Sequence, residues 1–356
     1  MSRIASIQNA LRQTADGGVD ALLLTDPISI RYAAGFHIDD GAAVIASDGA
    51  WLVTDSRYIE AAQAAVSDMT VLCVSREKPL DTILAELLSG YGAVGAEQNR
   101  MSRADWLKYE SKLARALRPA DDVLAVLRAS KDAAEIALCT AAQRIAERAL
   151  DDVLGLLRPG MTEKEAAAEL VYRMYKYGGE RNSFDPIVVT GPKTSMPHGV
   201  PGDEVIRDGD FITMDFGTMV GGYCSDMTRT VAIGHVTDEM RRVYDTVLEA
   251  QLAGIAAARP GVTGRAIDAA ARDVIERAGW GAYFGHSFGH SLGLEIHEAP
   301  NAAYSNDRPM PEGAFISAEP GIYLPGRFGV RIEDTMWLRG GGAEVITRAP
   351  KELIVL

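Results

Sequence analysis

Short apolar runs alternate with helically spaced segments along the first 125 residues. The runs that have the length and composition of buried strands are DALLL (20–24), AAVIA (42–46), AWLVT (50–54) and MTVLCV (69–74). The turn residues Ser47-Asp48-Gly49 predict a hairpin between the second and third runs. Residues 56–66, 79–90 and 103–115 have helical spacing. The pattern predicts a self-contained α/β domain over residues 1–125.

The helical pattern becomes longer over residues 127–157, where it predicts one continuous helix. Ser130 is the expected N-cap, and Asp132 and Glu135 lie in the first turns, where acidic side chains favour the helix dipole. A chain of 356 residues is longer than a single core usually holds. We therefore expect a second domain over residues 126–356, beginning just before this helix.

A faint internal repeat organises the second domain. The segments RPGMT (158–162), ITMDFG (212–217) and SDMT (225–228) recur in the same order as RPGVT (259–263), ISAEPG (316–321) and IEDT (332–335). His198 and His297 hold a fourth pair of corresponding positions. Four matches in order favour a duplicated helix–helix–hairpin unit over a chance resemblance of hairpins. The repeat predicts an α+β domain with pseudo-two-fold symmetry.

The repeat also places two carboxylates in each half, Asp215 and Asp226 in the first and Glu319 and Glu333 in the second. If the two halves pack together, the four acidic side chains lie close to one another at the base of one site. Their mutual repulsion and their loss of hydration would then force the carboxylates to become protonated. A cation relieves both costs. Oxygen-rich ligation with one imidazole suits Mn, Co or Fe, with Zn also possible, and four shared carboxylates are enough for two metals.

Alternation along strands predicts the neighbours of these acids, because side chains two residues apart share a face. Thr228 is expected beside Asp226, and Arg331 beside Glu333, where each would orient a ligand carboxylate. The alternative for Arg331 and Glu333 is an ordinary ion pair on a strand.

Charge and cysteine content narrow the class of protein. The net charge of −13 argues against a nucleic-acid partner, since phosphate binding needs a basic face. No apolar run approaches the roughly 20 residues of a membrane span, and the first residues lack the apolar centre of a signal peptide. The three cysteines are far apart, which indicates a reducing compartment. We expect a cytoplasmic protein with no membrane or nucleic-acid partner.

Three of the six histidines fall in GHSFGHSLGLEIHEAP, residues 285–300. The same stretch contains G-x-S-x-G around Ser287, the pattern of a serine hydrolase nucleophile. That motif needs a helix after the serine and a histidine further along the chain, whereas a strand-like alternation follows and no histidine lies beyond His297. A zincin helix is excluded because position 301 is Asn. His290, His286 and His297 are therefore candidates for a metal or substrate site, and the glycines at 285, 289 and 293 would let backbone pass close to it.

The segments TSMPHG, MDFGTMVGGYCSDMTRT, GHSLGLEIHE, SAEPGIY and GVRIEDT, in this order and spacing, resemble the pita-bread metallopeptidases. The Xaa-Pro peptidase branch, which contains aminopeptidase P and prolidase, is the most similar. ISIRYAAGF (28–36) and TDSRY (54–58) are similar to the creatinase-type N-terminal domain. The resemblance implies a creatinase-type domain over 1–125, a pita-bread catalytic domain over 126–356 and hydrolysis of the Xaa-Pro bond.

The resemblance implies two divalent metal ions, with manganese expected, and a set of five ligands: Asp215, Asp226, His290, Glu319 and Glu333. Asp226 and Glu333 would bridge the metals, and Glu319 would also accept a proton from the attacking water. It implies that His198 and His297 contact the substrate and assist proton transfer. His286 would line the proline pocket, and Tyr323 and Arg331 would support the substrate site. The resemblance also implies a homodimer in which N-terminal domains border the partner's site.

Several alternatives stay open at this point. A non-catalytic peptide-binding relative, a metal-free creatinase-type enzyme and a methionine aminopeptidase are less favoured, because all five ligands and an N-terminal domain are present. Many prolidase-type members have an arginine after the His-Glu pair, suited to a substrate carboxylate, but HEAPN (297–301) has none. We therefore expect an Xaa-Pro aminopeptidase, with an Xaa-Pro dipeptidase as the alternative. Arg327 or the partner subunit's Arg57 is the expected substitute for that arginine.

Overall fold

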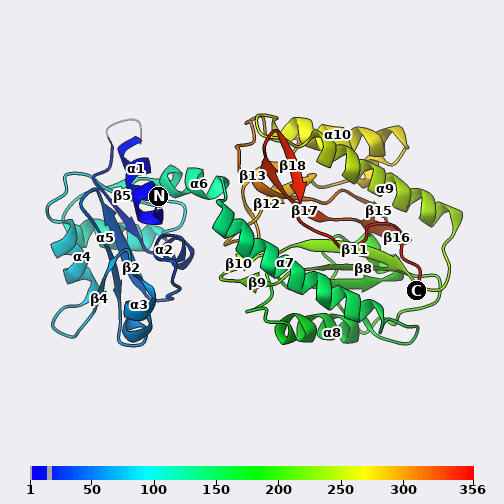
Figure 1. Cartoon of the computed structure of the whole chain (residues 1–356), viewed down its shortest axis with the longest axis horizontal. Helices are drawn as coiled ribbons and strands as arrows, with labels where there is room; N and C mark the ends of the chain where they lie inside the picture. Colours follow the sequence, from blue (N-terminus) through cyan, green and yellow to red (C-terminus); the bar gives the residue numbers. More distant parts are fainter. Residues whose placement is uncertain (1, 14–17) are drawn as a thin grey trace. The chain divides into compact units, whose positions relative to one another are not determined.

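The computed structural model describes residues 2–13 and 18–356 and divides into two compact units, one ending at Arg128 and one over Ala129–Leu356 (Figure 1). The expected boundary at 125/126 lies inside the helix α6 (Asp121–Ala129), and the structural division falls at the end of that helix. None of the helices in the described ranges is long and apolar enough to cross a membrane.

The first unit is built around one mixed sheet with the strand order β4-β3-β2-β1-β5-β6. β1 pairs antiparallel with β2 and β2 with β3, and the other pairs are parallel. The predicted hairpin around Ser47-Asp48-Gly49 is confirmed. The elements are α1 (Arg3–Gln13), β1 (Ala21–Leu24), α2 (Pro27–Ala34), β2 (Gly41–Ala46), β3 (Gly49–Thr54), α3 (Ile59–Ala65), β4 (Thr70–Cys73), α4 (Leu80–Leu88), β5 (Val94–Ala96), α5 (Arg103–Leu113) and β6 (Leu117–Pro119).

The long helix predicted within 127–157 is confirmed as α7 (Ala133–Leu154), but it begins two residues later than expected. Its N-cap is Asp132 and not Ser130, and residues 127–129 belong to the end of α6. The Asp132 carboxylate accepts from the backbone N–H groups of Ala134 and Glu135, and the Glu135 side chain accepts from the N–H of Asp132. This capping box fixes the first turn of α7. Ser130 instead donates its hydroxyl hydrogen to the carbonyl of Glu312.

The second unit places its strands between two helix pairs, with α7 and α8 on one side and α9 and α10 on the other (Figure 1). A three-stranded sheet has the order β11-β8-β7, and a five-stranded sheet has the order β13-β12-β14-β17-β18. The helices are α8 (Glu163–Lys176), α9 (Asp238–Ala257), α10 (Gly264–Arg277) and the short 3-10 turns η1 (Gly191–Ser195) and η2 (Gly281–Tyr283). The strands are β7 (Ile187–Thr190), β8 (Phe211–Phe216), β9 (Met219–Val220), β10 (Tyr223–Cys224), β11 (Met227–Ala232), β12 (Gly289–Ser291), β13 (Glu298–Ala302), β14 (Phe315–Ala318), β15 (Gly321–Leu324), β16 (Phe328–Arg331), β17 (Asp334–Arg339) and β18 (Gly342–Val345).

The two RPG-x-T segments form matching turns, which supports the predicted repeat. Thr162 caps α8 and Thr263 caps α10, each with its side-chain oxygen. The backbone N–H of Gly160 donates to Ile206, and the corresponding N–H of Gly261 donates to Met310. The first threonine forms an isolated bridge to Val205 and the second to Pro309. The pseudo-two-fold architecture therefore extends to individual hydrogen bonds.

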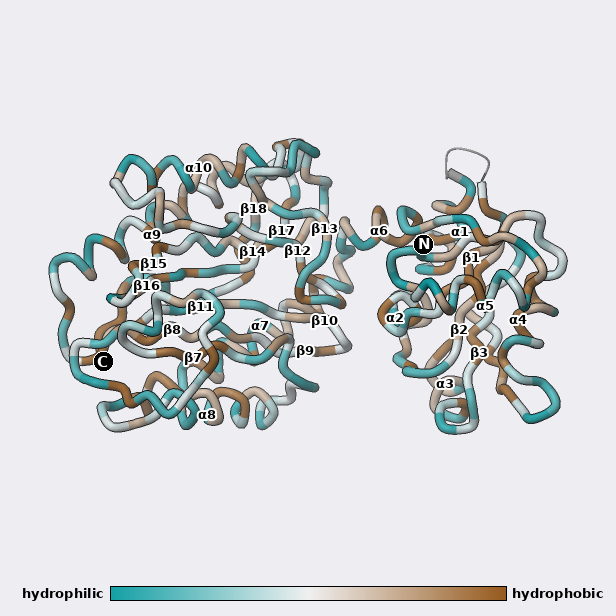
Figure 2. The backbone as a smooth tube through the Cα atoms, turned by 180° about the vertical axis from the view of Figure 1, so that it is seen from behind, coloured by the Kyte–Doolittle hydropathy of each residue, from teal (hydrophilic) through white to brown (hydrophobic). Residues whose placement is uncertain are grey.

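Amphipathic helices hold these layers together. Figure 2 shows hydrophilic and hydrophobic residues alternating along α8 and α10. On α10 the buried positions Ile267, Ala271, Val274 and Ile275 follow helical spacing, and they pack in the same apolar cluster as Ile316 of β14. Burial of this face removes apolar surface from water and so fixes the helix against the sheet.

β12 and β14 approach closely at Gly289. A Cβ atom at this position would lie 2.0 Å from the carbonyl oxygen of Ser317. Gly293 is similarly restricted, since its Cβ would lie 2.9 Å from Cε of Lys131. Gly285 differs from both, because no atom outside its chain neighbours lies within 4 Å of an added Cβ. Close contacts therefore oppose an added side chain at the second and third glycines of the segment. The expected passage close to the site holds for the first two glycines, Gly285 and Gly289, which line the cavity described below, whereas Gly293 does not line it.

The different surroundings of Gly289 and Gly285 predict that one added methyl group lowers stability at Gly289 more than at Gly285. Gly289→Ala forces β12 away from β14, so the free energy of unfolding should fall by about 1–3 kcal/mol. Gly285→Ala is the matched control and should change it by less than about 0.5 kcal/mol. Urea denaturation of both variants checks this, and equal midpoints would contradict the close packing.

Candidate metal centre

One cavity of about 1030 Å³ collects all ten site residues expected from the sequence. The carboxylates come from separate places in the fold: Asp215 lies on β8, Asp226 directly before β11, Glu319 directly after β14, and Glu333 between β16 and β17. His290 lies on β12. The other residues expected at the site, which also line the cavity, are His198, His286, His297, Tyr323 and Arg331.

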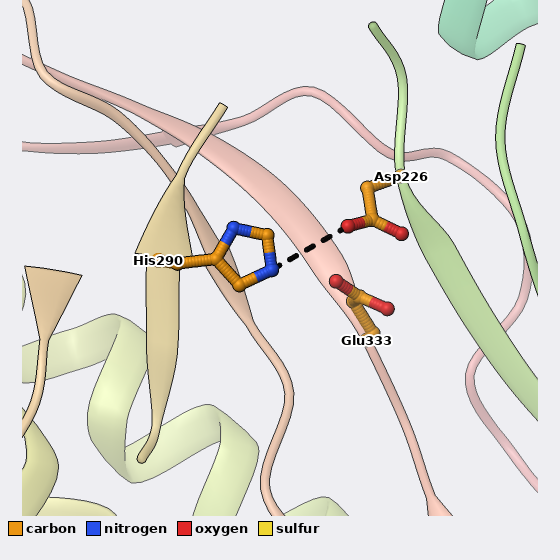
Figure 3. Close-up of side chains that lie close together, drawn as sticks. All are labelled: Asp226, His290 and Glu333. Atoms are coloured by element: carbon orange, nitrogen blue, oxygen red, sulfur yellow. Dashed lines mark ion pairs between the residues drawn. The ribbon is translucent and has the colours of Figure 1, made fainter. Parts of the chain in front are cut away.

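Asp226, His290 and Glu333 form the tightest cluster, with one ligand atom of each within 4.8 Å of the others. Figure 3 shows the imidazole pointing toward both carboxylates, which reach it from other segments of the domain. Nε2 of His290 lies 3.6 Å from Oδ2 of Asp226 and 3.2 Å from Oε1 of Glu319. Three of the five expected ligands therefore form one cluster, and a fourth, Glu319, lies beside its imidazole.

The backbone determines which nitrogen of His290 faces this point. Nδ1 lies 3.2 Å from the carbonyl oxygen of Ser291, which can only accept, so Nδ1 carries a hydrogen. In the neutral ring, Nε2 then presents a lone pair toward the oxygens of Asp226 and Glu319. Lone pairs that face one another need a positive charge between them. Either a proton on Nε2 or a metal ion meets that need.

Three carboxylate oxygens at the site have no hydrogen-bond partner although they are buried: Oδ1 of Asp215, Oδ1 of Asp226 and Oε1 of Glu333. A buried acceptor without a partner costs free energy, and a charged one costs more. All three belong to the expected ligand set. Oxygen donors grouped around one imidazole nitrogen fit a hard or borderline divalent cation.

The pKa values of the buried acids reflect the same cost of placing several carboxylates close together away from water. Burial and the neighbouring Glu333 raise the pKa of Asp226 well above its ordinary value, and burial and Glu319 do the same for Glu333. Burial also raises the pKa of Asp215, against the opposing effect of Arg331. Glu319 is the exception, because the effect of His290 outweighs burial and lowers its pKa to about 2. A divalent cation would reverse these upward shifts by stabilising the ionised carboxylates.

Neutral and cationic side chains hold the acids in orientation. Thr228 was expected to orient Asp226, but its hydroxyl donates to Oε2 of Glu333 at 2.7 Å, a carboxylate of the other half of the repeat. Arg331 was expected to orient Glu333, but its guanidinium pairs with Asp215 at 2.6 Å and donates to Thr228 at 3.1 Å. The strand argument failed here because Arg331 ends β16, and Glu333 lies after that strand, where alternation no longer applies.

Ser317 is a supporting residue that sequence reasoning missed. Its hydroxyl donates to Oε1 of Glu319 at 2.9 Å and accepts from the backbone N–H of His290 at 3.0 Å. It therefore links two expected ligands. The available signal was its position on β14 two residues before Glu319, which directly follows that strand.

Tyr323 and His286 form a second network beside the acids. Nδ1 of His286 lies 2.9 Å from the carbonyl of Ser287, so this nitrogen carries the hydrogen and Nε2 accepts. The Tyr323 hydroxyl, 2.8 Å from Nε2, must then donate to it, and it accepts from Arg331 at 2.9 Å. Burial lowers the pKa of His286, which agrees with a neutral ring.

His297 lies next to the ligand cluster. Its ring meets that of His290 edge to face, with centroids 4.3 Å apart. Burial and the neighbouring His290 lower the pKa of His297, so the neutral form predominates at pH 7. His198 reaches the same cavity from the loop after η1.

The serine hydrolase arrangement is absent from this described segment. Ser287 is followed by β12 and not by a helix, so the strand–turn–helix context of a nucleophile elbow is missing. The expected strand over 292–298 is wrong for most of its length, since residues 293–297 form bends and β13 begins at Glu298. Arg327, a proposed substitute for the missing arginine, pairs with Glu239 and does not line the cavity.

Comparisons with known proteins agree with this geometry. Residues 137–339 match the model of metallopeptidase family M24, and residues 3–130 match the creatinase/prolidase N-terminal domain. An Xaa-Pro dipeptidase of Pyrococcus furiosus is 34% identical, over 95% of this chain and 96% of its own length. The structure of an Xaa-Pro dipeptidase from Bacillus anthracis is 39% identical with a TM-score of 0.94, covering 99% of both chains. That of an X-Pro aminopeptidase from Thermotoga maritima is 36% identical with a TM-score of 0.92, covering 98% of this chain and 100% of its own.

These matches span both units, and the match to the solved structures extends over almost the whole chain. Together with the pseudo-symmetric fold and the carboxylate floor, they identify a pita-bread enzyme that uses divalent metal ions. The chain belongs to metallopeptidase family M24 and carries a creatinase/prolidase-type N-terminal domain.

Proposed function

We propose that this metallopeptidase hydrolyses the Xaa-Pro bond of dipeptides. The observation that carries the proposal is the set of three unpartnered, buried carboxylate oxygens on Asp215, Asp226 and Glu333, at the floor of the cavity that also contains His290. The preference for a dipeptidase over the expected aminopeptidase comes from the relatives, since the similar proteins named above include two Xaa-Pro dipeptidases.

The proposed metal ligands are Asp215, Asp226, His290, Glu319 and Glu333, with manganese as the proposed metal. The chemistry supplied by two such ions is Lewis acidity toward the scissile carbonyl and activation of water as the nucleophile. In this proposal Asp226 and Glu333 would be the ligands that the two ions share; both belong to the cluster around His290, and each has one unpartnered oxygen.

Proton transfer is assigned to Glu319 and His297. Ser317 donates to the Glu319 carboxylate and so orients it to take a proton from the attacking water. His297 is neutral at pH 7, so it can accept a proton and return it to the leaving nitrogen. His198 lines the same cavity and is proposed to contact the substrate.

The wall formed by His286 and Tyr323 suits a proline ring. The bond before proline is a tertiary amide without an N–H, so an enzyme cannot hold it through that donor. Ring contacts and polarisation of the carbonyl must replace the missing hydrogen bond. The hydrogen bond between His286 and Tyr323 fixes both rings in place before substrate arrives, which reduces the cost of ordering them.

An Xaa-Pro aminopeptidase is the second candidate. Among the described residues that line the cavity, the only arginine or lysine is Arg331, and its guanidinium is already paired with Asp215. A dipeptide carboxylate would therefore depend on the histidines or on a group from elsewhere, such as the partner subunit's Arg57 in the homodimer that we propose.

A direct comparison of substrates separates these candidates. The proposal predicts that kcat/KM is higher for Ala-Pro than for Ala-Pro-Ala, because a dipeptidase recognises the carboxylate next to proline. Initial rates should be measured with added Mn²⁺ over the same range of peptide concentrations. Faster hydrolysis of Ala-Pro-Ala would favour the aminopeptidase.

Loss of one central carboxylate should remove both metal and activity. Asp226→Asn removes a charged ligand, so we expect bound Mn²⁺ to fall and kcat/KM to drop by more than about 100-fold, beyond the usual effect of an outer supporting residue. Asp208→Asn is the control, since Asp208 forms an exposed pair with His235. Elemental analysis and peptide hydrolysis check both variants. Full Mn²⁺ content in Asp226→Asn would contradict the ligand assignment.

The raised pKa values of Asp226 and Glu333 predict how pH affects the metal-free protein. An acid with a higher pKa in the folded state binds more protons there than in the unfolded state, so stability falls as pH rises. The free energy of unfolding without metal should therefore decrease from about pH 5 to about pH 8. Saturating Mn²⁺ should remove most of that decrease. Urea titrations with and without Mn²⁺ test this, and parallel pH profiles would argue against a cation at these acids.

A further inference from the structure

A buried lysine lies behind the segment that carries His290 and His297. The Lys131 side chain is only 1% exposed, and its Nζ lies 2.9 Å from Oγ of Ser291 and 3.1 Å from Oε2 of Glu298. Ser291 follows His290, and Glu298 follows His297. The histidines line the cavity, whereas Lys131 and its two partners do not.

The partners of Lys131 are themselves tied to the backbone. Ser291 accepts from the lysine and donates to the carbonyl of Phe315 at 2.8 Å. The second oxygen of Glu298 accepts from the backbone N–H of Glu295 at 3.0 Å. An added Cβ at Gly293 would lie 2.9 Å from the lysine Cε, so the bend at 293–297 closes directly around the lysine chain.

The main chain at Lys131 is anchored as well. Its N–H donates to the carbonyl of Gly313 at 2.8 Å, and the hydroxyl of Ser130 donates to the carbonyl of Glu312. Residues 312–313 lead into β14, and Glu319 follows that strand. Lys131 therefore connects β12, β13 and the start of β14, the three elements that lead to His290, His297 and Glu319.

Stabilisation of the fold does not by itself explain why the charged side chain of Lys131 is buried here. Burying a lysine and a glutamate costs hydration that their attraction often fails to recover, and a pair of apolar side chains of similar size is frequently as stable. A charged pair does fix direction, however, because its hydrogen bonds are satisfied in one arrangement only. The side chain is long enough to reach two strands at once.

We propose that Lys131 is a positioning residue, which fixes the segment 291–298 from behind so that His290 meets the metal and His297 meets the substrate. The proposal rests on the proposed function for the role of His297. It concerns the charge and reach of Lys131, which act through Ser291 and Glu298 and not through contact with substrate.

The test uses Lys131→Met and the double variant Lys131→Met/Glu298→Gln in the full chain. The single variant leaves Glu298 without the lysine and should unfold at lower temperature. The double variant removes both charges and should recover most of that loss. In both variants we expect kcat for Ala-Pro to fall by about 10- to 100-fold with KM within about twofold. We expect Mn²⁺ affinity, measured by calorimetry, to weaken by about tenfold or more.

Arg144→Met is the matched control, because Arg144 forms a partly buried pair with Glu147 on α7 and does not line the cavity. It should lower the unfolding temperature and leave kcat and Mn²⁺ affinity unchanged. Wild-type kcat and Mn²⁺ affinity in either folded Lys131 variant would overturn the proposal, as would a kcat that recovers together with stability in the double variant. If the unsubstituted enzyme hydrolyses no Xaa-Pro peptide, the proposed function fails, and the Mn²⁺ measurement still decides on Lys131.

Discussion

The mutual repulsion of buried carboxylates is the constraint on which the rest of this structure depends. Asp215, Asp226 and Glu333 each keep an unpartnered oxygen, and Nε2 of His290 faces the carboxylates of Asp226 and Glu319. Protons can relieve the repulsion only by neutralising the acids, whereas divalent ions relieve it and keep the charge. The need for a cation therefore follows from the burial of the acids, and metal-dependent hydrolysis follows from the cation.

Holding such groups together requires a rigid surrounding. Arg229 is 1% exposed, and its guanidinium donates to the carbonyls of Thr228 and Glu333 and to the carboxylate of Asp334. Arg229 lies on β11, the strand that follows Asp226. Its bond to the carbonyl of Glu333 therefore ties the segment of Glu333 to that strand. Thr228 and Ser317 act on the carboxylates themselves. These bonds belong to the fold itself, so part of the cost of assembling the site is met during folding.

The two halves of the repeat correspond in their elements and in their acidic residues but differ in the histidines that their strands carry. Asp215 corresponds to Glu319, Asp226 to Glu333 and His198 to His297. β7, the first strand of the three-stranded sheet, carries no histidine, whereas β12 carries His290. Lys131 supports the histidine-bearing segment of the second half. The acids therefore occur in both halves, whereas His290, the proposed imidazole ligand, and the buried Lys131 beside its segment belong to one half.

The sequence by itself predicted the two domain families, the repeat and ten residues that line one cavity, because each depends on motifs in a fixed order. The roles of these residues as metal ligands stay predictions. Sequence reasoning failed where distant groups compete. Arg331 turns from Glu333, two residues away, to Asp215 on β8, which lies 116 residues away in the sequence. Ser317 and Lys131 were missed for the same reason. Their partners are distant in sequence or depend on strand register, and only tertiary packing selects among the possible partners of a charged or polar side chain.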